Sequence, residues 1–452
     1  MAQPAVNGPL PSGLLVHHPQ QPVAWHRGTA LSSERFFHDV ANLAAQLPQS
    51  GFVFNLCEDR YHFLVSFAAA IVCGQITLMP SNNTPGAVNA LLRERPGSYC
   101  LCDREVPGVQ APQHLFDTLI REDQTLLPLP REIPPNQQVA ILFTSGSTGD
   151  PKANPKTWGE LQAEADTALR HFPFLTRGIA SVVATVPAQH MYGLATSVFF
   201  PWQGGMAVHT GRPLFPADIA ADLALTTGPR VLITTPLHLR ACIDSGVSWP
   251  DIEFVISATA PLSRELAREA EQQMRTEIYE IYGSTETGSI ASRRTVHEQH
   301  WHLYEGIEIT FDQGIATAQG AHLFEPVRLN DQIRLLDDKR FLLQGRVTDM
   351  LKIAGKRASL GDLNQKLLAI PGVIDGVFVA PENPSTEHQR LTALVVAPGL
   401  TKQDILSALA QSVDAAFQPR PLYFVDALPR NNTGKLPRDA LQQLLASLKQ
   451  SS

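Results

Sequence analysis

The chain has 452 residues, of which 44% are hydrophobic and 17% charged, so it can bury large cores and is expected to divide into at least two domains. A net charge of −7 and the lack of a Lys/Arg run argue against a nucleic-acid partner. The longest apolar stretch, residues 63–79, is interrupted by polar residues and is shorter than the roughly 20 residues that span a bilayer. We therefore expect a buried helix followed by a strand there, and no membrane span.

The five cysteines are an odd number and mostly lie in apolar surroundings. Cys100 and Cys102 form a C-x-C pair without a second pair or a His cluster, which supports a zinc site only weakly. We expect ordinary thiols in a reducing cytoplasm. The first 21 residues contain four prolines but no basic segment and no long apolar one, so no secretory signal is expected and the predicted location is cytoplasmic.

Short β-prone runs alternate along the chain with segments long enough for helices. This alternation predicts an α/β fold whose large N-terminal part has mixed, largely parallel sheets flanked by helices. The runs span residues 52–56, 139–143, 181–186, 230–234, 254–257 and 278–282. Residues 157–160, Thr-Trp-Gly-Glu, match a capping box, and Trp158, Leu161 and Ala165 then recur on one face, so a helix is predicted to begin there.

The character of the sequence changes near Gly345. Before it, residues 332–336 and 340–344 predict a β-hairpin. After it, the elements expected are helices near 363–369, near 402–417 and at the C-terminus, and strands near 373–380, 391–397 and 422–425. We therefore predict a large domain of residues 1–345 and a small α+β domain of residues 346–452.

Residues 144–152, Thr-Ser-Gly-Ser-Thr-Gly-Asp-Pro-Lys, have the composition of a phosphate-holding loop. Glycines let the backbone approach an anion and turn N–H groups toward it, hydroxyls add donors, and the lysine adds charge. The loop is predicted to lie between a strand and a helix. The spacing G-x-x-x-x-G-K-[ST] is absent, which disfavours an ordinary P-loop NTPase, and a purely structural Ser/Gly turn is the alternative.

Three further segments follow in order, and they are Tyr282-Gly283-Ser284-Thr285-Glu286-Thr287-Gly288, Gly345-Arg346-Val347-Thr348-Asp349-Met350-Leu351-Lys352 and Asn432-Thr433-Gly434-Lys435. Together with the loop they resemble the adenylate-forming superfamily, which includes acyl-CoA synthetases, adenylation domains of peptide synthetases and firefly-type luciferases. The resemblance covers residues 139–441 and, more weakly, the part before them. It implies an AMP-forming ligase that uses ATP and Mg²⁺ and whose small C-terminal domain is mobile.

The resemblance assigns the ATP phosphates and the metal ion to two of these segments. The residues that would hold the β- and γ-phosphates are Thr144, Ser145, Gly146, Ser147, Thr148, Gly149 and Lys152. Glu286 would ligate Mg²⁺, which takes carboxylate and phosphate oxygens, and Thr285 would contact the α-phosphate. A solvated loop carboxylate is the alternative for Glu286. Catalysis in such a site is mostly positioning plus electrostatic stabilisation.

The adenine is expected between two segments. Tyr282, followed by Gly283, offers it a flat face. Thr259 and Ala260, in the run Ser-Ala-Thr-Ala-Pro, resemble the small-residue strand end on the other side of the ring. Alone, that run would indicate only close packing.

The ribose is expected to meet a carboxylate and a guanidinium. Asp331 falls where the family has a Gly-Asp pair that binds the ribose hydroxyls, although Asn330 replaces the glycine here. Arg346 follows at fifteen residues and resembles the second ribose and phosphate contact. An isolated arginine would usually be a surface charge.

Lys435 is expected to act in the first half-reaction. In the family this lysine lies on a loop of the mobile domain and bridges the substrate carboxylate and the α-phosphate, where it offsets charge that grows in the transition state. After adenylation the small domain is expected to rotate about residues 346–349 and form a tunnel for a thiol. The family usually has Asp or Lys where this chain has Thr348, which leaves the control of the rotation open. An exposed lysine after a turn glycine is the alternative for Lys435.

Residues 187–193, Pro-Ala-Gln-His-Met-Tyr-Gly, resemble the motif that abuts the acid substrate. We expect His190, Met191, Tyr192 and Ala258 to contact the acid, with His190 also a catalytic candidate. Relatives that activate benzoates and cinnamates have a His at this place, whereas amino-acid adenylators usually have Phe. No acidic residue is clearly placed to bind an α-ammonium, so the predicted substrate is an aromatic acid such as a hydroxybenzoate. A satisfied core imidazole is the alternative for His190.

The compact chain also resembles the ligases of bacterial aryl-polyene and xanthomonadin-type pathways, which load a hydroxybenzoate-like starter onto an acyl carrier protein. No Asp-Ser-Leu-type phosphopantetheine site is visible, so the expected acceptor is CoA or a separate acyl carrier protein. A medium- or long-chain fatty acyl-CoA ligase, a luciferase-like enzyme and a non-catalytic nucleotide-binding relative are the alternatives. The presence of Lys435 and Glu286 argues against the non-catalytic one.

Overall fold

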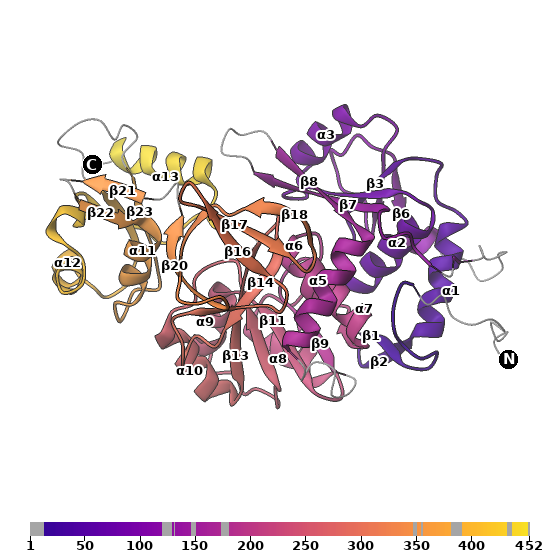
Figure 1. Cartoon of the computed structure of the whole chain (residues 1–452), viewed down its shortest axis with the longest axis horizontal. Coiled ribbons are helices and arrows are strands. Elements are labelled where there is room, and N and C mark those ends of the chain that lie inside the picture. Colours follow the sequence, from indigo (N-terminus) through magenta and orange to yellow (C-terminus); the bar gives the residue numbers. More distant parts are fainter. Residues whose placement is uncertain are drawn as a thin grey trace.

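The computed structural model describes residues 13–119, 129–130, 132–145, 151–172, 180–346, 350–353, 356–380, 391–431 and 436–450. Three parts follow one another along the long axis of the molecule (Figure 1). A sheet of N-terminal strands lies at one end, a larger sheet extends through the middle, and the C-terminal elements lie at the other end. The α/β architecture that the sequence predicts is confirmed.

The larger sheet has a parallel centre and antiparallel edges. Strands β1, β10, β9, β11, β12 and β13 run parallel to their neighbours in that order, and β14 begins the antiparallel side. Buried apolar runs such as Val-Leu-Ile in β11 suit a sheet that is covered on both faces. Its strands in the described chain, in spatial order, are β19 (Asp331–Leu335), β20 (Arg340–Arg346), β15 (Trp301–Leu303), β14 (Gly288–Arg293), β13 (Glu277–Ser284), β12 (Phe254–Ser257), β11 (Arg230–Thr234), β9 (Ser181–Ala184), β10 (Ala207–His209), β1 (Pro22–His26) and β2 (Thr29–Ser32).

The N-terminal sheet is parallel except at one edge. Its strands in the described chain, in spatial order, are β6 (Gln113–Leu115), β5 (Tyr99–Cys102), β3 (Phe52–Asn55), β4 (Ile76–Met79), β7 (Gln138–Ser145) and β8 (Pro151–Thr157). Strands β7 and β8 form an antiparallel hairpin around the predicted phosphate loop. The predicted helix α5 follows this loop, but β8, which the sequence does not predict, lies between them. Pro151 and Pro155 make this segment look unlike a strand in the sequence, and the fold tolerates them because β8 lies at the sheet edge.

Helices cover the sheets in the predicted alternation. Helix α5 begins at Trp158 with the predicted capping box, in which Glu160 Oε2 accepts from Thr157 N at 2.7 Å and Thr157 Oγ1 accepts from Glu160 N at 3.3 Å. The segment from Met191 to Gly204 is a continuous helical stretch with a π-helical turn in its middle. The helices before residue 345 are α1 (Ser33–Ala44), α2 (Arg60–Val72), α3 (Pro85–Glu94), α4 (Phe116–Leu119), α5 (Trp158–His171), α6 (Met191–Leu194), the π-helix η2 (Ala195–Phe199), α7 (Phe200–Gly204), α8 (Pro216–Ala224), α9 (Pro236–Asp244) and α10 (Arg264–Met274).

Aromatic side chains fill the largest core, which joins residues of both large sheets. Phe67 of α2 stacks on Trp202 of α7 with 6.0 Å between the ring centroids, and Phe199 lies 5.5 Å from Trp158 of α5. All four side chains are fully buried, and each such burial contributes roughly 1.5–3 kcal/mol. The expectation of a buried helix followed by a strand within residues 63–79 is confirmed by α2 and β4.

The C-terminal elements have cores of their own. The helices are α11 (Leu360–Leu368), α12 (Lys402–Ala410), the 3-10 turn η4 (Ala415–Phe417) and α13 (Arg438–Gln450), and the strands are β21 (Met350–Ile353), β22 (Lys356–Ser359), β23 (Asp375–Val379), β24 (Thr392–Val396) and β25 (Leu422–Phe424). Leu445 of α13 belongs to one buried cluster with Leu394 and Val396. The single helix expected at 402–417 is wrong: α12 ends at Ala410, and Asp414 starts a new turn by accepting from Ala416 N at 3.0 Å.

A small antiparallel sheet, which the sequence does not predict, follows β15 and consists of β16 (Glu308–Asp312), β17 (Ile315–Gly320) and β18 (Leu323–Arg328). The cysteines are free thiols, and four of them are buried, as expected. Within the described ranges, no helix combines the length and the apolar character that crossing a membrane requires.

Candidate active site

Most of the predicted site residues that the structure describes lie at one edge of the two large sheets. Parallel strands have their carboxyl ends at the same edge, and in open α/β sheets ligands bind there. Thr144 lies near the end of β7, Ala258 directly follows β12, and Tyr282 lies near the end of β13. His190 follows β9, separated from it by a short turn. The sequence motifs are thus brought together by strand direction.

Lys152 and Glu286 form an ion pair, although they lie far apart in the sequence. Lys152 in β8 donates to Glu286 Oε1 at 3.0 Å, and Glu286 lies in the turn between β13 and β14. Partial burial would raise the pKa of Glu286, but the hydrogen bond and the charge of Lys152 hold this pKa below its ordinary value. The carboxylate is therefore ionised at neutral pH. An ionised carboxylate beside a phosphate-type loop is a donor that fits Mg²⁺.

A second lysine of β8, which the sequence motifs do not single out, fixes the backbone of the same turn. Lys156 is only 8% exposed, and its ammonium donates to the Glu286 carbonyl at 2.8 Å. Lys152 and Lys156 therefore hold the side chain and the main chain of Glu286 respectively. In the sequence, a lysine between a proline and a threonine gives no sign of this role.

The turn that carries Thr285 and Glu286 is braced from inside and outside. Ser284 Oγ and Thr287 Oγ1 lie 3.1 Å apart, and each hydroxyl also accepts from the other residue's backbone N–H. Directly after the turn, Glu164 of α5 accepts from both the backbone and the hydroxyl of Ser289, at 2.7 and 2.9 Å. Glu164 is 3% exposed, and sequence reasoning misses it because it reads as an ordinary helical residue.

Gly283 is required by a close approach between two strands. The pairing of β13 with β14 shifts register between Tyr282 and Gly283, and a Cβ at Gly283 would overlap the carbonyl of Gly288. A β-bulge of this kind redirects the side chains next to it. The motif glycine therefore permits the bulge from which the Ser284–Glu286 turn begins.

Tyr282, predicted at the adenine, and Asp331, predicted at the ribose, are in direct contact. The Tyr282 hydroxyl donates to Asp331 Oδ2 at 2.8 Å, and the tyrosine ring packs at 5.5 Å from the ring centroids of both Trp301 and Phe341. Asp331 begins β19 and Arg346 ends β20, where the two residues are direct cross-strand partners. The spacing of fifteen residues is therefore that of a hairpin whose open end presents both residues.

The small-residue run after β12 contains an unusual backbone. Thr259 has φ +79°, a left-handed conformation that is rare for a β-branched residue. Such a backbone costs about 1–3 kcal/mol and concentrates at functional sites. Ala258 is buried and Ala260 is half-buried beside it.

The 187–193 motif forms a tight turn that leads into α6. A Cβ at Gly193 would overlap the Pro187 carbonyl, so glycine is needed for the turn to fold back. His190 is half-buried, whereas Met191 is 7% exposed and lies in the core. The Tyr192 hydroxyl donates to the carbonyls at the ends of β11 and β12, at 3.1 and 2.8 Å, so it serves the fold, and burial raises its pKa.

His190 lines a cavity of about 360 Å³. Its walls come from the segments after β3, β4, β9 and β10, all at the same carboxyl edge. Arg60 and Arg212 contribute positive charge to these walls, and Asn431 reaches the cavity from the C-terminal part. Asn431 immediately precedes the segment that contains Lys435.

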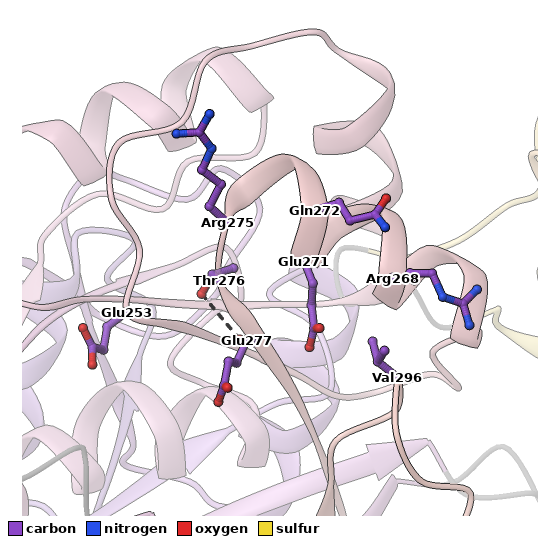
Figure 2. A pocket seen from close by; sticks show the side chains of 8 residues that line it. All are labelled: Glu253, Arg268, Glu271, Gln272, Arg275, Thr276, Glu277 and Val296. Carbon is purple, nitrogen blue, oxygen red and sulfur yellow. Dashed lines mark hydrogen bonds between the residues drawn. The ribbon is translucent and has the colours of Figure 1, made fainter.

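A second pocket, of about 500 Å³, lies at the opposite edge of the sheet (Figure 2). Glu253 and Glu277 mark its place at the amino ends of β12 and β13, away from the motif residues. Arg294 pairs with Glu271 at 3.1 Å and with Glu277 at 2.7 Å. Position and paired charges both argue against it as the catalytic cleft.

Some predicted residues lie outside the described part of the chain. They are Gly146, Ser147, Thr148, Gly149, Thr348 and Lys435, together with the side chains of Ser145 and Arg346. Their roles remain predictions.

Comparison with known proteins identifies the family. A profile described as "AMP-binding enzyme" matches residues 17–339. The chain is similar to a 4-coumarate–CoA ligase of Rhodobacter capsulatus, with 29% identity over 300 residues, which are 66% of this chain and 74% of that protein. It is similar to the fatty acid–[acyl-carrier-protein] ligase ScoC of Streptomyces coeruleorubidus, with 25% identity over 364 residues, 70% of this chain and 69% of that protein.

The fold matches that of O-succinylbenzoate coenzyme A synthetase (MenE) of Bacillus subtilis, solved in complex with ATP and a magnesium ion, with a TM-score of 0.81 at 16% identity over 94% of this chain and 97% of that one. The match extends over both the large N-terminal part and the C-terminal elements. The chain therefore belongs to the AMP-binding enzyme family, as an AMP-forming acid–thiol ligase that uses ATP and Mg²⁺.

Proposed function

We propose that this enzyme joins an aromatic carboxylic acid, such as a hydroxybenzoate, to ATP as an acyl-AMP with release of pyrophosphate, and then transfers the acyl group to the phosphopantetheine thiol of CoA or an acyl carrier protein. The observation that carries the proposal is that three features of the site lie at the same edge of the parallel sheets. The Lys152–Glu286 pair, the Tyr282–Asp331 pair and the cavity beside His190 all lie where the parallel strands end. A carboxylate is a poor electrophile because oxide would have to leave, and AMP is a far better leaving group.

We assign charge control to the β7–β8 hairpin and the turn after β13. Lys152 and the loop between the two strands would grip the β- and γ-phosphates, and Thr285 would contact the α-phosphate. Glu286 would hold Mg²⁺, which neutralises phosphate charge as pyrophosphate leaves. The ionised state of Glu286 and its two lysine contacts support this assignment.

We assign the nucleoside to the open end of the β19–β20 hairpin. Asp331 and Arg346 face each other across the two strands, which supports a joint contact with the ribose. Tyr282 is held in place by its bond to Asp331, so one residue of the ribose site also fixes the expected adenine face. The strained backbone of Thr259 supports the other side of the adenine site.

We assign adenylation to Lys435 on a mobile domain of residues 346–452, which swings against the domain of residues 1–345. The separate cores of the C-terminal elements support two units, because a unit with its own core can move as a body. Asn431 lies at the cavity beside His190, only a few residues before Lys435, which supports access of this lysine to the acid. A rotation about residues 346–349 would then admit the thiol.

We favour an aromatic acid over a long alkyl chain. Pockets for apolar ligands are lined predominantly by hydrophobic side chains, whereas this cavity has Arg60, Arg212 and Asn82 in its walls. The similarity to a 4-coumarate–CoA ligase agrees with a ring-bearing acid. The similarity to ScoC supports the second candidate, a fatty acid transferred to a carrier protein.

The test is acid-dependent release of pyrophosphate from ATP and Mg²⁺, with hydroxylamine to trap the adenylate. The panel contains benzoate, hydroxybenzoates, cinnamates, medium-chain fatty acids and amino acids. We expect the strongest release with one aromatic class, followed by thioester formation when CoA or a holo carrier protein is added. Release with fatty acids alone would support the second candidate, and no release with any acid would refute the proposal for this panel.

A further inference from the structure

Arg212 is a half-buried cation that forms no ion pair with the described residues. It lies on the segment after β10 and lines the cavity beside His190. No described residue gives it a hydrogen bond or an ion pair. Burial lowers the pKa of Arg212 and the charge of Glu58 opposes this effect, so the arginine keeps its charge at neutral pH. A desolvated charge is costly unless an opposite charge or hydrogen bonds compensate it.

Arg60 adds a second guanidinium to the same cavity. It is 3% exposed and donates only to neutral groups, with Nη2 bonded to the carbonyls of Ala184 and Val186 at 3.2 and 2.8 Å and Nη1 bonded to the Ser197 hydroxyl. Its Nε is buried without a hydrogen-bond partner. Burial, followed by the positive charge of Arg212, lowers the pKa of Arg60 to about 10. The positive charge of Arg212 therefore acts on Arg60, and the charge of Asp59 opposes it.

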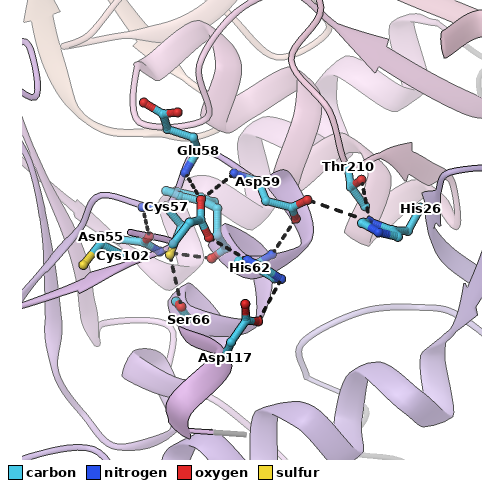
Figure 3. Close-up of polar contacts among 12 residues, drawn as sticks. His26, Asn55, Cys57, Glu58, Asp59, His62, Ser66, Cys102, Asp117 and Thr210 are labelled. Carbon is cyan, nitrogen blue, oxygen red and sulfur yellow. Dashed lines mark hydrogen bonds and ion pairs between the residues drawn. The ribbon is translucent and has the colours of Figure 1, made fainter. Parts of the chain in front are cut away.

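The turn before Arg60, the first residue of α2, is held by hydrogen bonds within the protein, and Figure 3 shows Glu58 and Asp59 of this turn. Asp103 Oδ2 accepts from the backbone N–H groups of Glu58 and Asp59 at 2.5 and 2.8 Å, and Asp103 Oδ1 lies 2.6 Å from His62 Nδ1. Burial would raise the pKa of Asp103, but His62 and these N–H groups hold it below the ordinary value. A wall fixed in this way loses little conformational entropy when a ligand binds.

The acidic side chain of the cavity offsets this charge only in part, since Glu58 raises the pKa of Arg212 against the larger effect of burial. Glu58 is the acidic member of the described lining, and its exposed carboxylate lies 3.0 Å from Arg104. The pocket in Figure 2 is the contrast, because there Glu271 and Glu277 already have Arg294 as their partner. Of these two pockets, the cavity at the carboxyl edge is the one whose described lining has more arginines than carboxylates.

We propose that this cavity is an oxyanion subsite, in which Arg212, backed by the field of Arg60, binds a carboxylate or phosphate group carried by one of the two organic substrates. The proposal rests on the proposed function, since it names what these substrates carry. The ATP phosphates are assigned to the β7–β8 loop and Lys152, so they do not account for the cavity. Two sources share the required chemistry: a second acidic group on the acid, and the phosphate of a phosphopantetheine arm.

Calorimetric titration of the full-length enzyme with matched ligand pairs tests the proposal without requiring turnover. One pair is terephthalate and benzoate, and the other is phosphopantetheine and pantetheine. The variants are Arg212→Ala and Arg212→Lys. The control is Arg268→Ala, which removes an exposed arginine from the wall of the other pocket (Figure 2).

In one pair the member with the additional anionic group should bind about 10- to 100-fold more tightly than its partner, the range of a charge-assisted hydrogen bond. Arg212→Ala should abolish this preference, Arg212→Lys should keep part of it, and Arg268→Ala should keep all of it. The pair that responds identifies the source of the anion. A preference in neither pair, or one that survives in Arg212→Ala, overturns the subsite.

The outcome is separable from the proposed function. Wild-type enzyme without acid-dependent pyrophosphate release would contradict the proposed function, whereas an Arg212-independent titration with normal release would contradict only the subsite. If Arg212→Ala lowers the unfolding temperature sharply, the comparison of Arg212→Lys with wild type still tests the subsite. If both proteins show the same preference within each ligand pair and the same affinity for every ligand, the guanidinium makes no contact with the ligand.

Discussion

Replacing Lys156 with methionine should slow adenylation while the protein stays folded. The Lys156 ammonium is 8% exposed and donates to the Glu286 carbonyl at 2.8 Å, so methionine keeps the buried stem and removes only the donor. A hydrogen bond from a charged group contributes about 1.5–3 kcal/mol. If the turn needs that bond to hold Glu286 in the transition state, the loss corresponds to about 10- to 150-fold in rate at about 1.36 kcal/mol per tenfold.

The assay is acid-dependent pyrophosphate release, with kcat and the KM for ATP measured separately at saturating Mg²⁺. We expect kcat to fall by that factor, the KM for ATP to rise, and the unfolding temperature to change by only a few degrees. The control is Lys366→Met, which removes an exposed ion pair with Asp362 at 2.9 Å and should leave both constants unchanged. Wild-type kcat and KM in Lys156→Met would refute the reasoning.

Three further predictions follow from the site and its supports. Lys435→Ala should lower adenylation by orders of magnitude and keep ATP binding in a calorimetric titration; normal adenylation would remove its assigned role. Gly283→Ala should abolish adenylation and lower the unfolding temperature, because its Cβ would overlap the Gly288 carbonyl; a fully active variant would contradict the required bulge. Asp103→Asn should destabilise the protein more at pH 6 than at pH 9. Burial lowers the pKa of His62, but Asp103 and its acidic neighbours raise it by more, so the pKa of His62 in the folded protein lies above its ordinary value. The charge pair of His62 with Asp103 therefore stabilises the protein fully below the unfolded-state pKa of His62. This stabilisation is lost as the pH rises through the folded-state pKa. Thermal unfolding measures this difference, and an equal loss at both pH values would argue against the charge pair.

The sequence predicts the parallel strands and most helices because their signals are local. The apolar runs of β9, β11 and β12 and the capping box at Thr157 need no knowledge of distant residues. Strand β8 escapes prediction because its prolines oppose strand formation, and only its position at a sheet edge makes them tolerable. An element that depends on a spatial neighbour, as β8 does, cannot be predicted from local sequence patterns.

The same distinction applies to the site. The spacing between Asp331 and Arg346 is readable because a hairpin connects them directly, and the structure places them opposite each other. The roles of Lys156, Glu164 and Arg212 cannot be predicted from the sequence, because each residue contacts or faces segments that are far away along the chain. These charged residues lie in no recognisable sequence motif, and their contacts become apparent only when the folded structure shows where they are buried.

The most direct test of the central claim is acid-dependent exchange of labelled pyrophosphate into ATP, measured without any thiol and with wild type beside Glu286→Gln. An enzyme that forms an acyl-AMP reversibly should exchange label only when its acid is present, and the variant should lose the exchange because the carboxylate assigned to Mg²⁺ is gone. Pyrophosphate exchange that occurs equally with and without the acid, or that is unchanged in Glu286→Gln, would contradict the account.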